Sequence, residues 1–201
     1  MKTITGSHPQ DADGQKPASW YDEAFKLPAY NVHYTNSSSY FSWAVIADRI
    51  LRSGCKSVLD IGCGPGQFAS LLYDKGIKEY TGIDFSPVSI QKASDRCPFY
   101  KFVLADLAAS DIMEKIAPSC VTALEVLEHI ENDIVLLQKI PSATLFLGTV
   151  PNFPYPSHVR HFQNMEEVSQ RYEALFSRFR VDEFRLKPDG SILFVMEGVK
   201  I

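Results

Sequence analysis

The chain has 201 residues, 45% of them hydrophobic and 22% charged, with a formal net charge of −4. This length suits one domain with a sizeable core, and no apolar run is long enough to span a membrane. The mild acidity gives no electrostatic reason to bind nucleic acid or an anionic membrane, so a small-molecule or protein substrate fits better, and the oligomeric state stays open.

The four cysteines show neither the paired spacing of a metal site nor the density of a disulfide scaffold. They are Cys55, Cys63, Cys97 and Cys120. The N-terminus also lacks the apolar core of a signal peptide. We therefore expect a protein of the reducing cytoplasm.

The N-terminal region divides into a polar tail and an aromatic segment. Residues 1–18 are rich in Gly, Pro and Asp and are predicted to be a disordered tail, which leaves residues 19–201 as a single domain. Six aromatic residues crowd the stretch 19–40, and residues 41–52 have the apolar spacing of an amphipathic helix. Residues 19–52 are therefore predicted to form a helical segment that packs on the sheet, closes as a lid over a ligand, or does both.

The stretch 58–72, VLDIGCGPGQFASLL, reads as a strand, a tight turn and a helix. Gly62, Gly64 and Gly66 at the turn allow positive φ and let a ligand lie against the backbone. The dinucleotide pattern GxGxxG is not met, because Gln67 fills the place of its third glycine. Asp60 would repel a pyrophosphate and pair with an ammonium group, so the loop favours a cationic ligand.

A second strand, residues 79–84, ends in an acid at the distance expected of one βαβ unit. Asp84 is therefore predicted to bind ribose hydroxyls, with a helix N-cap as the plain alternative. Phe85 follows and can lie on an adenine face. Ser86 and Pro87 have the residue types that begin a helix.

The remaining elements complete an α/β pattern. Further strands are predicted at 100–105, 120–124 and 143–150, a helix at 164–176, and a hairpin of strands 179–186 and 191–199 around Pro188, Asp189 and Gly190. Asp106 closes the third strand, so each of the first three strands carries a carboxylate near its C-terminal end. The alternation of strands and helices indicates a Rossmann-like, doubly wound sheet, which binds ligands outside those ends.

The sequence DIGCGPG resembles motif I of class I S-adenosylmethionine-dependent methyltransferases. The resemblance covers roughly residues 40–201 and implies the seven-stranded sheet of that fold, completed by the antiparallel hairpin. It also implies that Asp60 and the glycine loop hold the methionine end of the cofactor. Asp106, with the backbone of Leu107, would then meet the adenine amino group.

The stretch ALEVLEHIEND, residues 123–133, leaves the fourth strand and would lie beside the cofactor's methyl group. Glu125 is assigned to the cofactor site, and Glu128 and His129 are the catalytic candidates. Three interpretations stay open: acids in the first turn of a helix, a general base at His129, or a divalent metal held by Glu125, Glu128 and His129 with a later histidine, His158 or His161.

The same EVLEH sequence resembles O-methyltransferases of ubiquinone biosynthesis, and a similar pattern occurs in small-RNA 2′-O-methyltransferases. The metal interpretation follows the second group, with His161 as the later ligand. The loop 150–162 is predicted either to face the substrate or to be an ordinary surface loop. No basic stripe or stacking platform for RNA is evident.

The sequence thus predicts a methyltransferase that transfers the methyl group of S-adenosylmethionine to a small molecule, at oxygen, with His129 as base. The alternatives are a metal-assisted 2′-O-methyltransferase of RNA and a protein that binds a nucleotide cofactor such as NAD.

Overall fold

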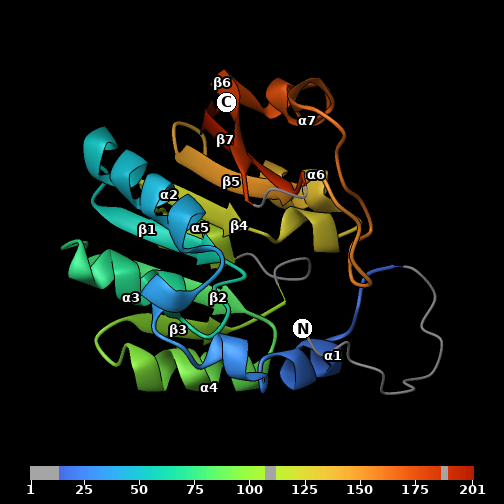
Figure 1. The fold of residues 1–201 in the computed structure, drawn as a ribbon. Coiled ribbons are helices and arrows are strands. Elements are labelled where there is room, and N and C mark those ends of the chain that lie inside the picture. The colour runs from blue at the N-terminus through green and yellow to red at the C-terminus, as the bar shows by residue number, and fades with distance from the viewer. Residues whose placement is uncertain (1–13, 107–111, 187–189) are drawn as a thin grey trace.

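A seven-stranded mixed sheet forms the centre of the molecule in a computed structural model that describes residues 14–106, 112–186 and 190–201 (Figure 1). The strand order is β3-β2-β1-β4-β5-β7-β6. The bounds are β1 Ser57–Ile61, β2 Glu79–Asp84, β3 Lys101–Leu104, β4 Cys120–Leu124, β5 Leu145–Pro151, β6 Phe176–Arg185 and β7 Ile192–Lys200.

The first five strands are parallel, and the last two run antiparallel to their neighbours. The carboxyl ends of β1 to β5 therefore open at one edge of the sheet. β1 is buried on both faces, as expected for a parallel strand covered by helices on each side. The predicted Rossmann-like, seven-stranded fold with an antiparallel hairpin is confirmed.

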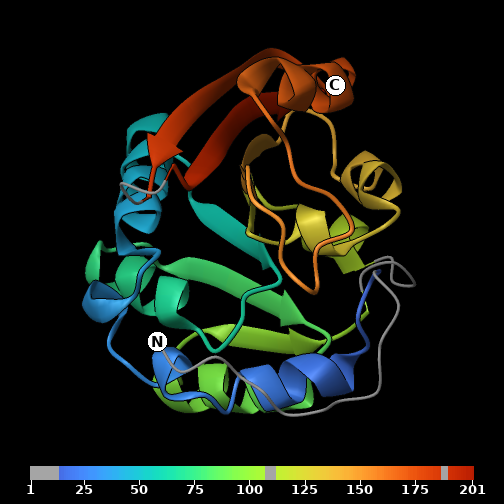
Figure 2. The ribbon, with the colours of Figure 1, turned by 45° about the vertical axis from the view of Figure 1, so that its right-hand side comes forward.

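Helices cover both faces of the sheet (Figures 1 and 2). On one face, α2 (Tyr40–Ser53) and α3 (Gln67–Asp74) share a core with Val58 and Leu147. On the other, α5 (Ile112–Ile116), α6 (Asp133–Gln138) and α7 (Met165–Tyr172) enclose a core that includes Phe146 and Phe194. These two cores fix the sheet on which the functional loops stand.

The aromatic N-terminal segment lies against α4 (Pro87–Arg96), as Figure 2 shows. It contains α1 (Ala18–Ala24) and two 3₁₀ turns, Pro28–Tyr30 and Tyr34–Asn36. Residues 1–13 of the predicted tail lie outside the described residues. Residues 14–17 precede α1 and are held by contacts: Lys16 is buried, and Gln15 accepts a hydrogen bond from the backbone of Glu131.

The C-terminal elements differ from their predicted bounds by a few residues. The helix predicted at 164–176 ends as α7 at Tyr172, and a 3₁₀ turn, Glu173–Leu175, leads into β6. Pro188 and Asp189 of the predicted turn lie outside the described residues, and Gly190 has a φ of +93°. Within the described part of the chain, every helix is too short or too polar to span a membrane.

Candidate functional site

The glycine loop between β1 and α3 lies at the open edge of the parallel strands. Gly62, Gly64 and Gly66 all have positive φ, between +54° and +77°. A Cβ at Gly62 would come within 2.5 Å of the Val126 side chain, and one at Gly66 within 3.0 Å of Ala93. Packing therefore already requires two of the glycines. Gly64 has space beside it, and the nearest atom belongs to Phe25 in the N-terminal segment 18–36, which is named the lid after its predicted role.

Asp60 lies beneath this loop and is 3% exposed. Its two carboxylate oxygens accept hydrogen bonds from the Thr122 hydroxyl at 2.6 Å and the Tyr80 hydroxyl at 2.7 Å. Burial raises the pKa of this carboxyl to about 6 and outweighs those two hydrogen bonds, which lower it. The structure thus shows Asp60 bracing β1 against β2 and β4.

Asp84 ends β2 and is also buried, with 5% of its surface exposed. One oxygen accepts the backbone N–H of Gly64 at 3.0 Å, and the other accepts the N–H of Ser86 at 2.9 Å. Burial raises the pKa of Asp84, and these backbone hydrogen bonds oppose that shift. Asp84 therefore joins the glycine loop to the start of α4, where the Ser86 side chain forms the predicted N-cap.

The lid covers this part of the loop. The Tyr21 ring lies 5.2 Å from the Phe85 ring, and a Phe25 atom is 3.9 Å from the position of a Cβ on Gly64. Asp22 accepts a hydrogen bond of 2.5 Å from the Ser86 hydroxyl. The Tyr21 ring of the lid thus packs against Phe85, and the contact of Phe85 with an adenine ring stays a prediction.

Two basic side chains of α4 hold the lid down. The Lys92 ammonium donates to the Phe25 carbonyl at 2.7 Å and to the Asn31 side chain at 2.8 Å. The Arg96 guanidinium donates to the Tyr30 carbonyl at 3.0 Å. These charge-assisted hydrogen bonds fix the backbone of the lid over the loop.

Asp106 follows β3 at the same edge and is exposed. Leu107 lies outside the described residues. Their predicted contact with an adenine ring thus stays a prediction.

Glu125 follows β4 in a left-handed conformation, with a φ of +57°. Its backbone N–H donates to the Thr149 hydroxyl at 2.8 Å, and its side chain accepts the Ser39 hydroxyl at 2.9 Å. Such a conformation costs a non-glycine residue about 1–3 kcal/mol and is often found at functional sites. At this residue the chain leaves the direction of β4 and enters the 3₁₀ turn that follows.

Glu128 and His129 lie in a 3₁₀ turn, Leu127–His129, and the helix begins only at Asp133. The His129 Nδ1 atom is 2.9 Å from the Ser157 carbonyl. Because a carbonyl oxygen only accepts, Nδ1 carries the proton and Nε2 is the free acceptor. Burial lowers the pKa of His129 to about 4, and burial together with the charge of Glu125 raises the pKa of Glu128 well above its usual range.

A cluster suited to a metal ion forms at this turn. Possible ligand atoms of Glu128, His129 and His158 all lie within 4.8 Å of one another. The His158 Nδ1 atom is held by the Phe153 carbonyl at 3.1 Å, so both rings are oriented by backbone carbonyls, as metal-bound imidazoles often are. Among the described residues the cluster contains neither Glu125 nor the exposed His161 of the predicted ligand set, and His158 is the later histidine that lies near Glu128 and His129.

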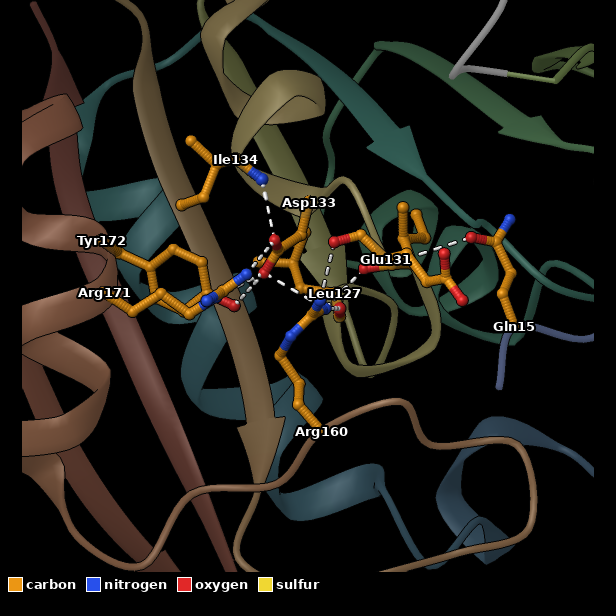
Figure 3. A network of polar contacts seen from close by, with 9 residues as sticks. Gln15, Leu127, Glu131, Asp133, Ile134, Arg160, Arg171 and Tyr172 are labelled. Carbon is orange, nitrogen blue, oxygen red and sulfur yellow. Dashed lines mark hydrogen bonds and ion pairs between the residues drawn. The ribbon is translucent and has the colours of Figure 1, made fainter. Parts of the chain in front are cut away.

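Arg160 ties the two loops of the site together (Figure 3). Its guanidinium donates to the carbonyls of Leu127, Ile130 and Glu131 and lies 3.2 Å from the buried Asp133 carboxylate. The segment that carries Glu128 and His129 is therefore held by the loop that carries Ser157 and His158.

Sequence reasoning missed several residues of this site. Tyr21 belongs to the aromatic stretch 19–40, where nothing distinguishes it from its neighbours, and no pattern marks Ser39 or Ser157. Ser39 lies 86 residues from its partner Glu125. Contacts over such separations leave no local periodicity to detect.

A comparison with known protein families gives a match that includes the sheet and the glycine loop. A family model described as a methyltransferase domain matches residues 43–185. The chain belongs to this methyltransferase family. The match favours the class I S-adenosylmethionine-dependent methyltransferase prediction over the NAD alternative. The lid up to residue 42 lies outside the matched region.

Several relatives with known names are trans-aconitate 2-methyltransferases. A trans-aconitate 2-methyltransferase of Paracidovorax citrulli (strain AAC00-1) is 32% identical over 128 residues, which is 60% of this chain and 47% of that protein. The chain spans about half the length of the curated relatives it matches. The likeness to ubiquinone-biosynthesis enzymes stays a prediction.

Solved structures with the same fold are more distant in sequence. The methyltransferase domain of bacterial CtHen1-C has a TM-score of 0.58 at 21% identity and covers 80% of this chain and 97% of its own. The Burkholderia thailandensis 1,6-didemethyltoxoflavin-N1-methyltransferase has a TM-score of 0.67 at 16% identity, with 96% and 93% covered. At these identities the likeness concerns the fold alone.

Proposed function

We propose that this protein transfers the methyl group of S-adenosylmethionine to a hydroxyl oxygen of a small molecule, with His129 as the base. The observation that carries the proposal is the hydrogen bond between His129 Nδ1 and the Ser157 carbonyl, which leaves Nε2 as a proton acceptor. The ring belongs to a turn at the carboxyl edge of β4, where a doubly wound sheet binds its ligands.

The cofactor would be held by the loop that begins at Gly62 and by the acids around it. Asp84 has both oxygens on backbone N–H groups, and each oxygen keeps a further lone pair for a ribose hydroxyl. Asp60 supports the loop from below, and Phe85 offers an aromatic face. Asp106 and Leu107 complete the proposed adenine contacts.

The reaction needs little covalent help from the protein. The acceptor oxygen attacks the methyl carbon, the carbon–sulfur bond breaks, and its electron pair stays on sulfur to give S-adenosylhomocysteine. The hydroxyl proton passes to His129 Nε2. Alignment of the oxygen with the breaking bond supplies most of the rate, and proton removal adds roughly 10²- to 10⁴-fold.

The test is a screen of phenols, catechols, sugars and carboxylic acids with S-adenosylhomocysteine release as readout. Mass spectrometry of the product then identifies the methylated atom. His129→Asn keeps an N–H group for the Ser157 carbonyl but has no basic nitrogen to accept a proton, so turnover should fall at least 100-fold. His33→Asn, at an exposed histidine of the lid, is the matched control. Full activity in His129→Asn would contradict the proposal.

A second candidate, metal-assisted methyl transfer, is favoured by the cluster of Glu128, His129 and His158. One Glu128 oxygen is buried without a hydrogen-bond partner among the described residues, and both imidazoles are oriented from behind, so the residues fit a divalent ion. A bound ion would polarise the acceptor hydroxyl. Chelation should then abolish turnover and a divalent ion restore it, whereas chelation leaves a metal-free base unaffected. An RNA acceptor is not favoured by the net charge of −4.

A further inference from the structure

Three buried polar atoms without partners meet at His129. The Tyr21 hydroxyl, one Glu128 carboxylate oxygen and the Ser157 hydroxyl make no hydrogen bond to any described residue. Glu128 and Ser157 are each 1% exposed. The three atoms come from the lid, the turn after β4 and the loop after β5, which are far apart in the chain.

Their positions relative to the His129 ring define one site. The Tyr21 ring stands edge-on to the His129 ring at 5.7 Å, and its phenol interacts with the Ser157 side chain without forming a regular hydrogen bond. Ser157 itself contributes the carbonyl that orients His129. Glu128 precedes His129 and belongs to the same cluster.

Partnerless buried polar groups are rare because each keeps the full penalty of its lost hydration. Three of them around one histidine indicate a place where a ligand supplies the missing hydrogen bonds. The two hydroxyls can donate or accept, and the Glu128 carboxyl group accepts, or donates when it carries its proton. A ligand that satisfies all three must itself carry hydroxyl groups or equivalent donors and acceptors.

The charge of the site argues against an acidic ligand. Burial raises the pKa of Glu125 and Glu128 and so disfavours their charged forms, and the obstacle to a carboxylate ligand is therefore the lack of a free cation. The guanidinium that acts on Glu128 is Arg160, and it is already engaged by three carbonyls and Asp133. An incoming carboxylate would therefore meet acids without a free cation from Arg160.

Aromatic rings complete the surroundings. Phe153 and Tyr155 lie 6.0 Å and 5.6 Å from the His158 ring, which in turn lies 4.8 Å from the His129 ring. With Tyr21 they offer flat apolar surfaces on which a ring can stack.

We propose that Tyr21, Glu128 and Ser157 form the acceptor site, and that it binds an uncharged hydroxylated ring compound rather than a polycarboxylate. The proposal rests on the proposed methyl transfer to a hydroxyl and names its substrate class. It sets this chain apart from its relatives that act on trans-aconitate, since a carboxylate acceptor is already deprotonated and needs no base.

The test measures binding to the full chain saturated with S-adenosylhomocysteine, which requires no proton transfer. By calorimetry, catechol should bind and trans-aconitate should not. Tyr21→Phe and Ser157→Ala should each weaken catechol binding at least tenfold. Tyr100→Phe is the matched control, because it removes a hydroxyl bound to the Ile77 carbonyl at the opposite end of the sheet, and it should bind catechol as the wild type does.

An unchanged affinity for S-adenosylhomocysteine in each variant shows that the fold is intact. The proposal would be overturned if trans-aconitate bound as tightly as catechol, or if no binding of catechol were detected. It would also be overturned if Tyr21→Phe and Ser157→Ala bound catechol with the affinity of the wild type. If His129→Asn binds catechol normally and still methylates it at the wild-type rate, His129 is not the base. That result would contradict the proposed function but not the proposed acceptor site.

Discussion

Asp60 and Asp84 lie at the carboxyl ends of neighbouring strands, yet their carboxylates meet different partners. Asp60 binds two side-chain hydroxyls beneath the loop, and Asp84 binds two backbone N–H groups at its surface. Asp84 is therefore the better placed of the two to contact a ligand directly. Asp60 acts on the loop through β1.

The stability of the protein should depend on pH through Asp60. Its pKa rises from an ordinary 3.8 to about 6 in the folded state, so the folded state binds a proton more tightly than the unfolded state. The stabilisation is complete below pH 3.8 and is lost as the pH rises through 6. Asp60→Asn does not titrate, so between pH 4.5 and 7.5 the wild type should lose about 2 kcal/mol relative to this variant.

Urea unfolding at the two pH values measures this difference. Thr122→Val, which removes one of the two hydroxyls that bind Asp60, should widen the pH dependence, because that hydrogen bond lowers the pKa. Parallel curves for wild type and Asp60→Asn would show that Asp60 has an ordinary pKa in the folded protein.

Asp84→Asn should weaken S-adenosylmethionine binding at least tenfold, or about 1.4 kcal/mol. The amide keeps the shape but loses the charge and one of the two acceptor oxygens. An S-adenosylhomocysteine analogue that lacks the ribose hydroxyls separates the two roles. If Asp84 binds the ribose, removal of the hydroxyls should cost less affinity in the variant than in the wild type, as measured by calorimetry. Equal losses would restrict Asp84 to joining Gly64 and Ser86.

The lid is held to the domain mainly by polar contacts. Among the described residues, α1 has no buried member, and the contacts that hold the segment include Asp22 on Ser86, Lys92 on Phe25 and Arg96 on Tyr30. Phe25, directly after α1, is buried, but α1 itself contributes no buried residue, so this short segment should open at a smaller cost in free energy than the sheet. It therefore suits a cover that must admit and release a ligand.

Lys92→Met should loosen this lid while the sheet stays intact. The substitution keeps the apolar stem but removes the ammonium that holds the Phe25 carbonyl and the Asn31 side chain. Hydrogen exchange of backbone amides in residues 20–36 should quicken several-fold, with no change in β1 or β4. Lys75→Met, at an exposed position after α3, is the control. Unchanged exchange in the lid would show that other contacts hold it.

Most elements could be predicted because their signals are local. β2 and β4 have the predicted bounds, and the Ser86-Pro87 start of α4 is confirmed. The interpretation of Glu128 as an acid in the first turn of a helix is wrong, because the left-handed Glu125 and a 3₁₀ turn follow β4 and the helix begins only at Asp133. That turn depends on Thr149 and Ser39, which belong to other elements, so the sequence around Glu125 does not indicate it.

The same limit applies to the site. Asp84 and the glycine loop follow from spacing within one βαβ unit, whereas Tyr21 and Ser157 reach His129 only through the folded arrangement of the lid and the loop after β5. The choice of His158 over His161 also depends on the path of that loop. The glycine loop and its acids are thus readable from the sequence, and the surroundings of His129 are not.

At the scale of the molecule, a buried ionic network joins the turn that carries Glu128 and His129 to the C-terminal half (Figure 3). Asp133 is fully buried and accepts two hydrogen bonds from Arg171, at 2.6 and 2.9 Å, and one from the Tyr172 hydroxyl at 2.7 Å. The Arg160 guanidinium also lies close to the Asp133 carboxylate, and it donates hydrogen bonds to the backbone carbonyls around His129. The network therefore connects α6 and α7 with both loops of the site.

Asp133→Asn should destabilise the protein by about 3–5 kcal/mol, because it leaves two guanidinium groups without their buried counter-charge. The matched control is Asp48→Asn, which breaks the exposed ion pair with Arg52 at 2.9 Å and should cost less than about 1 kcal/mol. Urea unfolding at pH 7 measures both. Since Arg160 also holds the carbonyls around His129, the Asp133 variant should lose turnover under conditions where it remains folded, and the Asp48 variant should not. Equal stability of the two variants would mean that the network contributes no more than a surface ion pair.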